Sequence, residues 1–149
     1  MIQTFNQTGL ATGDPDVDAF LRDSPTAVLM GILFDQRIRA EVAFSGPYKL
    51  LQRLGHFDMT RIAGMEAEAF YEAFTKPPAV HRFSNMMSAR TQEFAAVMAT
   101  KYSGNATGLW EDKPSKELLF SRVRSLNGFG PGKLKKLIPA MTLFGHELL

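Results

Sequence analysis

Residues 126–133 combine residue types and spacing that suit the binding of an anion. Three glycines stand at alternate positions and a lysine follows the last of them: Gly128, Gly130, Gly132 and Lys133. Glycine adopts positive φ angles and lets another backbone come close. A turn of this kind that opens a helix presents free N–H groups to an anion. We therefore predict that these four residues bind phosphates of a nucleic acid.

Basic residues gather around this segment. Between positions 113 and 136 the chain has seven lysines and arginines and one acid, Glu117, whereas its overall net charge is only +2. A basic block in a near-neutral protein indicates one binding face rather than a generally cationic surface. The alternative is a solvated, lysine-rich pair of helices.

The elements that must position these residues are predicted to be helices. Apolar residues recur at helical spacing, and no segment shows the sustained alternation that is typical of a strand. We expect an all-α fold of about seven to nine helices, with the glycines in a helix-hairpin-helix turn between helical runs at 118–126 and 133–144. Residues 25–44 are predicted to form the central buried helix, ended by the breaker Ser45-Gly46-Pro47. Other helices are expected near residues 14–22, 47–54, 58–64, 66–74, 84–102 and 106–110.

Length and composition limit the organisation of the chain. Its 149 residues suit one domain, and the absence of cysteine excludes a disulfide scaffold, a thiolate-bound metal and thiol catalysis. We expect an irregular segment at residues 1–13 and one helical domain at 14–149, with Pro77-Pro78 as the candidate boundary between two lobes. No apolar run approaches the roughly 20 residues that span a bilayer, and no secretory signal is evident, so the expected location is the cytoplasm.

Three groups of short stretches carry a resemblance to a known family. The first is LMGILFDQRI at 29–38 with AFSGPY at 43–48, the second is KPPAVHRF at 76–83 with MSAR at 87–90, and the third is LNGFGPGK at 126–133 with LFG at 143–145. In this order they resemble the helix-hairpin-helix (HhH-GPD) superfamily of base-excision DNA repair proteins, and within it a bacterial branch of HhH-GPD-type repair proteins. The likeness covers roughly residues 14–146.

The resemblance implies a helical, two-lobed fold with DNA across its cleft. Active members flip a damaged base out of the duplex and cut its N-glycosidic bond, with an aspartate that stabilises the sugar cation or activates water. In the members that are also Schiff-base lyases, a lysine stands where this chain has Gly132, and Lys133 lies one residue later, about 100° further round a helix. The family aspartate would fall beyond Leu149, and Glu147 is the only acid after Gly132.

Five further residues become site candidates through the resemblance. Gln36 matches the residue that inserts into the duplex in place of the flipped base, and Arg37, Tyr48 and His81 are expected near the base pocket. Asp35 is the candidate catalytic carboxylate. Each has a structural alternative: an ion pair of Asp35 with a neighbouring arginine, a polar helix end at Gln36, a core or capping histidine, and a core tyrosine.

These observations predict a DNA-binding protein of the base-excision-repair type. If active, it is a monofunctional DNA N-glycosylase without lyase activity. The alternatives are a DNA-lesion-binding protein that has lost the catalytic aspartate, and a structural helical domain whose hairpin packs on another protein. The expected partner is double-stranded DNA carrying damage, with no membrane partner, no metal site and no required cofactor. A monovalent cation held by carbonyls of the hairpin is optional.

Overall fold

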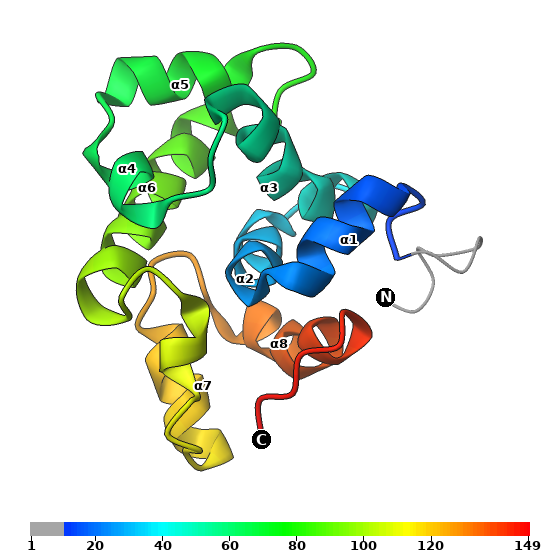
Figure 1. Cartoon of the computed structure of the whole chain (residues 1–149), viewed down its shortest axis with the longest axis vertical. Helices are drawn as coiled ribbons and strands as arrows, with labels where there is room; N and C mark the ends of the chain where they lie inside the picture. The colour runs from blue at the N-terminus through cyan, green and yellow to red at the C-terminus, as the bar shows by residue number, and fades with distance from the viewer. Residues whose placement is uncertain (1–10) are drawn as a thin grey trace.

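The computed structural model describes residues 11–149, and all regular elements in that range are helical (Figure 1). In chain order they are α1 (Pro15–Asp23), α2 (Pro25–Phe34), α3 (Ala40–Leu54), α4 (Met59–Gly64), α5 (Ala67–Thr75), α6 (Ser84–Lys101), the 3-10 helix η2 (Ala106–Leu109), α7 (Lys116–Arg124) and α8 (Pro131–Leu143). The predicted all-α class is confirmed for this part of the chain. Most of the segment expected to be irregular, 1–13, lies outside the described residues.

Side-chain caps mark the starts of four of the α-helices in residues 11–149. Asp14 accepts backbone N–H bonds at the start of α1, Ser24 does so for α2, Asp58 for α4 and Ser115 for α7. A short polar side chain at this position satisfies N–H groups that the first helical turn leaves unpaired. None of the helices in residues 11–149 is both long and apolar enough to cross a membrane.

The prediction of one helix over residues 25–44 is wrong. The chain leaves the helix after α2, turns through residues 35–39, where Arg37 has a φ of 58°, and starts α3 at Ala40. The expected breaker at residues 45–47 lies inside α3. Pro47 removes one helical donor, yet the helix continues to Leu54.

Two glycines explain why α2 and α3 lie so close together. A Cβ atom on Gly31 of α2 would overlap the ring of Phe44, and one on Gly46 of α3 would lie 2.6 Å from Cδ2 of Phe34. Each helix therefore receives a phenylalanine of the other against a bare backbone. Gly46 is thus a packing residue rather than a helix breaker, and both phenylalanines are fully buried.

Helix α2 forms the centre of the core. All its residues after Pro25 are buried, and it packs against α1, α3, α6, η2 and α8. Helices α4 and α5 both pack on α6 at one end of the molecule, while α7 and α8 lie at the other end (Figure 1). The carboxyl end of α2 is therefore surrounded by elements from both halves of the chain. The division into two lobes at residues 77–78 stays a prediction.

Candidate functional site

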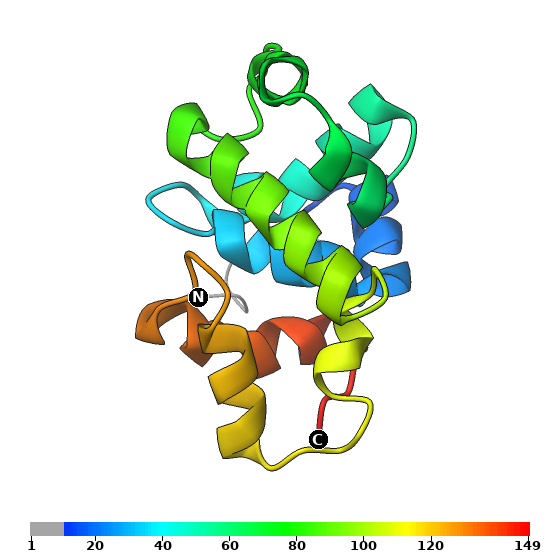
Figure 2. The ribbon, with the colours of Figure 1, turned by 90° about the vertical axis from the view of Figure 1, so that its left-hand side faces the viewer.

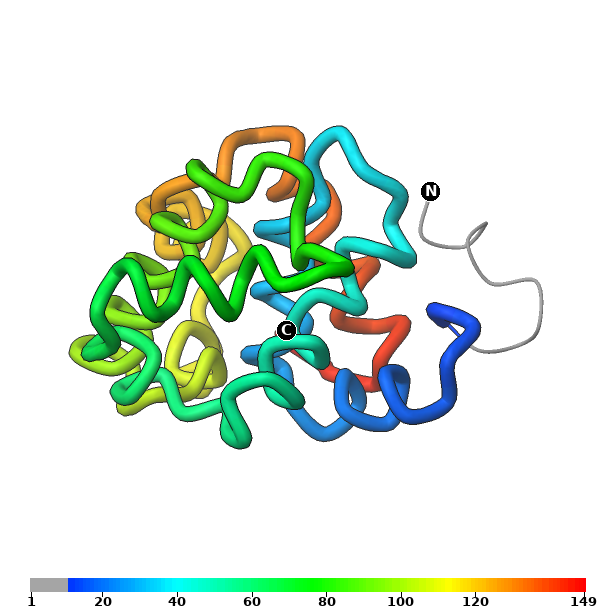
Figure 3. The backbone as a smooth tube through the Cα atoms, turned by 90° about the horizontal axis from the view of Figure 1, so that it is seen from above, coloured from blue at the N-terminus to red at the C-terminus, as the bar shows by residue number. Residues whose placement is uncertain are grey.

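Two segments that are far apart in sequence meet on one face of the molecule. The loop of residues 35–39 after α2 lies beside the glycine-rich segment, residues 126–133, which joins α7 to α8 (Figures 2 and 3). Gly128 has a φ of 96°, and a Cβ there would lie 2.7 Å from Cδ1 of Leu33 and 3.2 Å from Cδ of Arg90. Both its conformation and its packing on α2 and α6 therefore require a glycine.

Gly130 and Gly132 are exposed and have no such structural requirement. Neither has a positive φ, and a Cβ on either would meet no atom within 4 Å. Within residues 11–149 no hydrogen-bond partner exists for the N–H of either glycine, which stand at the N-terminal end of the 13-residue helix α8. Unpaired N–H groups at the positive end of a helix dipole attract anions.

The side chain of Lys133 does not point outward, as a contact with phosphate would require. Its Nζ donates to the carbonyl of Leu33 at 2.8 Å and to Oε1 of Gln36 at 2.9 Å, and the residue is only 8% exposed. Burial, together with the charges of Arg90 and Lys136, lowers its pKa to about 8. Because Lys133 lies one residue beyond Gly132, its side chain turns inward and caps the carboxyl end of α2.

Asp35 forms an ion pair, but with a different partner from the one anticipated. Its Oδ2 lies 3.0 Å from Nζ of Lys136, and the same Nζ lies 3.3 Å from the Asp35 carbonyl. The side chain of Asp35 is 11% exposed. Lys133 and Lys136, one helical turn apart on α8, thus bind neighbouring groups at the end of α2, and the geometry is that of a structural ion pair.

Gln36 and two arginines line a groove next to the glycine-rich segment. The groove has a volume of about 540 Å³ and is lined by Gln36, Arg90, Arg124, Ser125, Leu126, Asn127, Gly128, Phe129 and Gly130. Neither arginine forms an ion pair with an acid of the described chain. Arg90 is not among the site residues predicted from the sequence, although it ends the MSAR stretch. The exposed side chain of Arg37 lies in the adjoining loop.

His81 and Tyr48 lie outside this groove. The buried His81 ring has Nε2 2.9 Å from the Phe34 carbonyl, while its Nδ1 accepts the N–H of Phe83 at 3.0 Å, so the proton belongs on Nε2. Burial lowers the pKa of His81, against the opposing effect of the Phe34 carbonyl. Tyr48 is on α3, and its ring lies 6.0 Å from that of Phe20. Both residues therefore match the structural alternatives given for them, a core histidine at position 81 and a tyrosine packed against the core at position 48.

No known protein family, curated protein or solved structure matches this chain. Residues 11–149 contain no cluster of histidine and acidic side chains that could hold a metal ion. The residues of the groove and of the glycine-rich segment are therefore the features of this chain that indicate a function. The optional monovalent cation stays a prediction.

Proposed function

We propose that this protein binds double-stranded DNA through the glycine-rich segment, in the manner of helix-hairpin-helix proteins of base-excision repair. The observation that carries the proposal is the pair Gly130 and Gly132. The fold itself needs no glycine at either position, and both present unpaired N–H groups at an exposed helix N-terminus. Absence of side chains there allows the close approach of a bulky, anionic backbone.

The groove supplies the remaining contacts. Arg90 and Arg124 add two guanidinium groups beside the N–H donors, and arginine suits the geometry of a phosphate. Contacts of this kind position a duplex without reading its sequence. With about two or three phosphates neutralised, the logarithm of the binding constant should fall with the logarithm of salt concentration with a slope of roughly −2 to −3.

Gln36 is the candidate for insertion into the duplex. It lines the groove, and its Oε1 accepts a hydrogen bond from Nζ of Lys133. In this proposal the amide of Gln36 occupies the space that a flipped base leaves, and the chemistry is monofunctional base removal. Lys133 does not act as a Schiff-base nucleophile, because its Nζ is buried against Leu33 and Gln36.

The second candidate function is lesion binding without catalysis. The pair between Asp35 and Lys136 favours it, because the carboxylate of Asp35 is already neutralised by a lysine. A carboxylate that stabilises a sugar cation works through its negative charge. Incubation of the purified protein with duplexes that carry alkylated, deaminated or oxidised bases separates the two functions. Abasic sites that depend on Asp35 support the glycosylase, whereas selective binding without base release supports the lesion binder.

DNA binding itself is tested by fluorescence anisotropy on a labelled duplex with an abasic-site analogue. Gly130→Val places a branched side chain where the phosphate would lie and should weaken binding at least about tenfold. The matched control is Gly64→Val, because Gly64 lies in α4 with open space around it. Arg124→Gln should weaken binding and reduce the salt slope by about one, against the control Lys101→Gln at an exposed residue that ends α6. Unchanged affinity in both Gly130→Val and Arg124→Gln would refute the proposed DNA face.

A further inference from the structure

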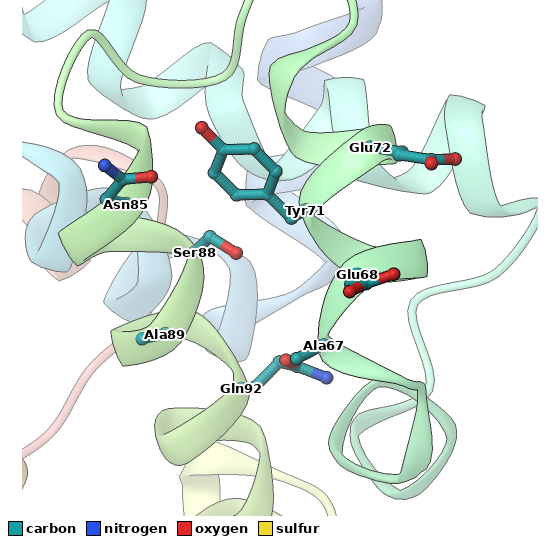
Figure 4. A pocket seen from close by; sticks show the side chains of 8 residues that line it. All are labelled: Ala67, Glu68, Tyr71, Glu72, Asn85, Ser88, Ala89 and Gln92. Carbon is teal, nitrogen blue, oxygen red and sulfur yellow. The ribbon is translucent and has the colours of Figure 1, made fainter.

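A groove between α5 and α6 plays no part in the proposed DNA binding. It has a volume of about 430 Å³ (Figure 4), and its lining consists of Ala67, Glu68, Tyr71, Glu72, Asn85, Ser88, Ala89 and Gln92. On α6, Ser88 and Arg90 are two residues apart and so project about 200° apart. Ser88 therefore faces α5 while Arg90 faces the glycine-rich segment, and these two elements lie on opposite sides of α6 (Figure 2).

The hydroxyl of Ser88 is the first observation that indicates a ligand. Ser88 is 5% exposed, and Figure 4 shows its oxygen directed into the space between the two helices. Its hydroxyl has no hydrogen-bond partner in the described part of the chain. By contrast, the buried hydroxyl of Thr91 on the same helix donates to the carbonyl of Met87 at 2.6 Å. The Ser88 oxygen is open to the groove rather than sealed in the core, so an atom of a bound ligand can use its free hydrogen-bonding capacity.

An aromatic ring and amide oxygens surround that hydroxyl. Tyr71 reaches from α5 across the groove toward Asn85 and Ser88, and it is 38% exposed (Figure 4). The amide nitrogen of Gln92 is occupied by the carbonyls of Ile62 and Met65, so its oxygen is the group left to accept. The groove thus offers an aromatic face together with several hydrogen-bond acceptors.

The negative charge of the groove lining favours a cationic ligand. Two acids, Glu68 and Glu72, belong to it and no basic residue does, although the chain as a whole has a net charge of +2. In Figure 4 Glu72 points away from Asn85 and Ser88, and the carboxylate of Glu68 lies over α5, so neither carboxylate reaches into the space between the helices. Neither forms an ion pair within residues 11–149. Their charges make the surroundings of the groove negative, which attracts cations and repels phosphates.

We propose that the α5–α6 groove is a binding site for an organic cation, namely a guanidinium or ammonium group on a short carbon chain. The charged group lies over the ring of Tyr71 and donates hydrogen bonds to the Ser88 hydroxyl and the Asn85 oxygen. Glu68 and Glu72 steer it electrostatically. Cations bind over aromatic faces because the ring carries negative charge on its faces, and acceptors around the rim add direction.

The test is a titration of the whole chain, followed by ¹⁵N–¹H NMR, with butylguanidinium and with butylurea, its uncharged isostere. We expect saturable shifts confined to amides of α5 and the first half of α6, with a Kd in the millimolar range, and none with butylurea. A capped Gly-Arg-Gly peptide distinguishes the source of the cation: tighter binding than butylguanidinium indicates an arginine side chain of a peptide, and equal binding indicates a free small molecule. Absence of saturable shifts up to about 50 mM butylguanidinium, or equal binding of butylurea, overturns the proposal.

Variants assign the contacts. Tyr71→Phe should retain binding within about twofold because the ring remains, whereas Tyr71→Leu and Ser88→Ala should each weaken it at least about fivefold. The double variant Glu68→Gln/Glu72→Gln should weaken binding and remove its salt dependence, and Glu117→Gln, an exposed acid of α7, is the control. Tyr71→Leu with a native-like spectrum and unchanged affinity refutes the role of the ring. The comparison of the two ligands on the unmodified chain decides the proposal if a variant fails to fold.

Discussion

The buried Lys133 should make the stability of this protein depend on pH in the alkaline range. Its pKa is about 8 in the folded protein and 10.5 when unperturbed. Between these values the unfolded chain holds the proton more tightly, so the free energy of unfolding rises with pH. Each pH unit contributes about 1.4 kcal/mol, which gives a rise of about 3 kcal/mol between pH 8 and pH 10.5.

Lys133→Met isolates this contribution, because methionine has a similar length and no titratable group. Urea denaturation at intervals from pH 7 to pH 11 measures the free energy of unfolding of both proteins. The difference between wild type and Lys133→Met should change by about 3 kcal/mol across the window, in favour of wild type as pH rises. Lys135→Met, which removes an exposed lysine two residues away, should leave the wild-type profile unchanged.

The same titration can be followed directly through the ¹³Cε signal of Lys133 in isotope-labelled protein. A midpoint near pH 8 would agree with the buried position on Leu33 and Gln36. Parallel stability profiles of wild type and Lys133→Met, or a midpoint near 10.5, would refute the placement of this lysine.

The remaining predictions concern other contacts around α2. The pKa of His81 is lowered, so the folded protein should lose stability as pH falls below about 6.5, and His81→Gln should flatten that acid limb of a thermal denaturation profile. Gly128→Ala should cost about 1–3 kcal/mol in chemical denaturation, whereas Gly132→Ala should be neutral or stabilise by up to about 1 kcal/mol; equal effects would contradict the different roles of the two glycines. In a double-mutant cycle, Asp35→Asn and Lys136→Met should show a coupling of about 1 kcal/mol, and additive effects would exclude their ion pair.

Local sequence signals predicted where the helices of this chain start better than they predicted how the helices pack. The starts of α1, α4 and α7 were predictable because a capping residue precedes each of them. The end of α2 could not be found from local signals, because the groups that pair with its last carbonyls, Lys133 and Lys136, come from α8. Proline and glycine in a segment such as residues 45–47 can either end a helix or lie inside one, and only the packing decides between these two structures.

A turn between two helices was predicted at the glycine-rich segment, and the chain does turn there between α7 and α8, but the contacts of the neighbouring residues were not predicted. A displacement of one residue on a helix already indicated that Lys133 leaves the face of Gly132. Its partners Leu33 and Gln36, however, lie about a hundred residues away in sequence. The Asp35–Lys136 pair has the same long separation, so a search among neighbouring arginines could not find it.

The reciprocal insertion of Phe34 and Phe44 against bare glycines has a consequence for recognition. It fixes the two helices on either side of the five-residue bridge between α2 and α3, and the two α8 lysines hold the first two residues of that bridge. Those two residues have lost conformational freedom before any partner arrives, so their ordering does not oppose association. The shape of this end of the bridge is thus fixed in advance, and a partner must conform to it.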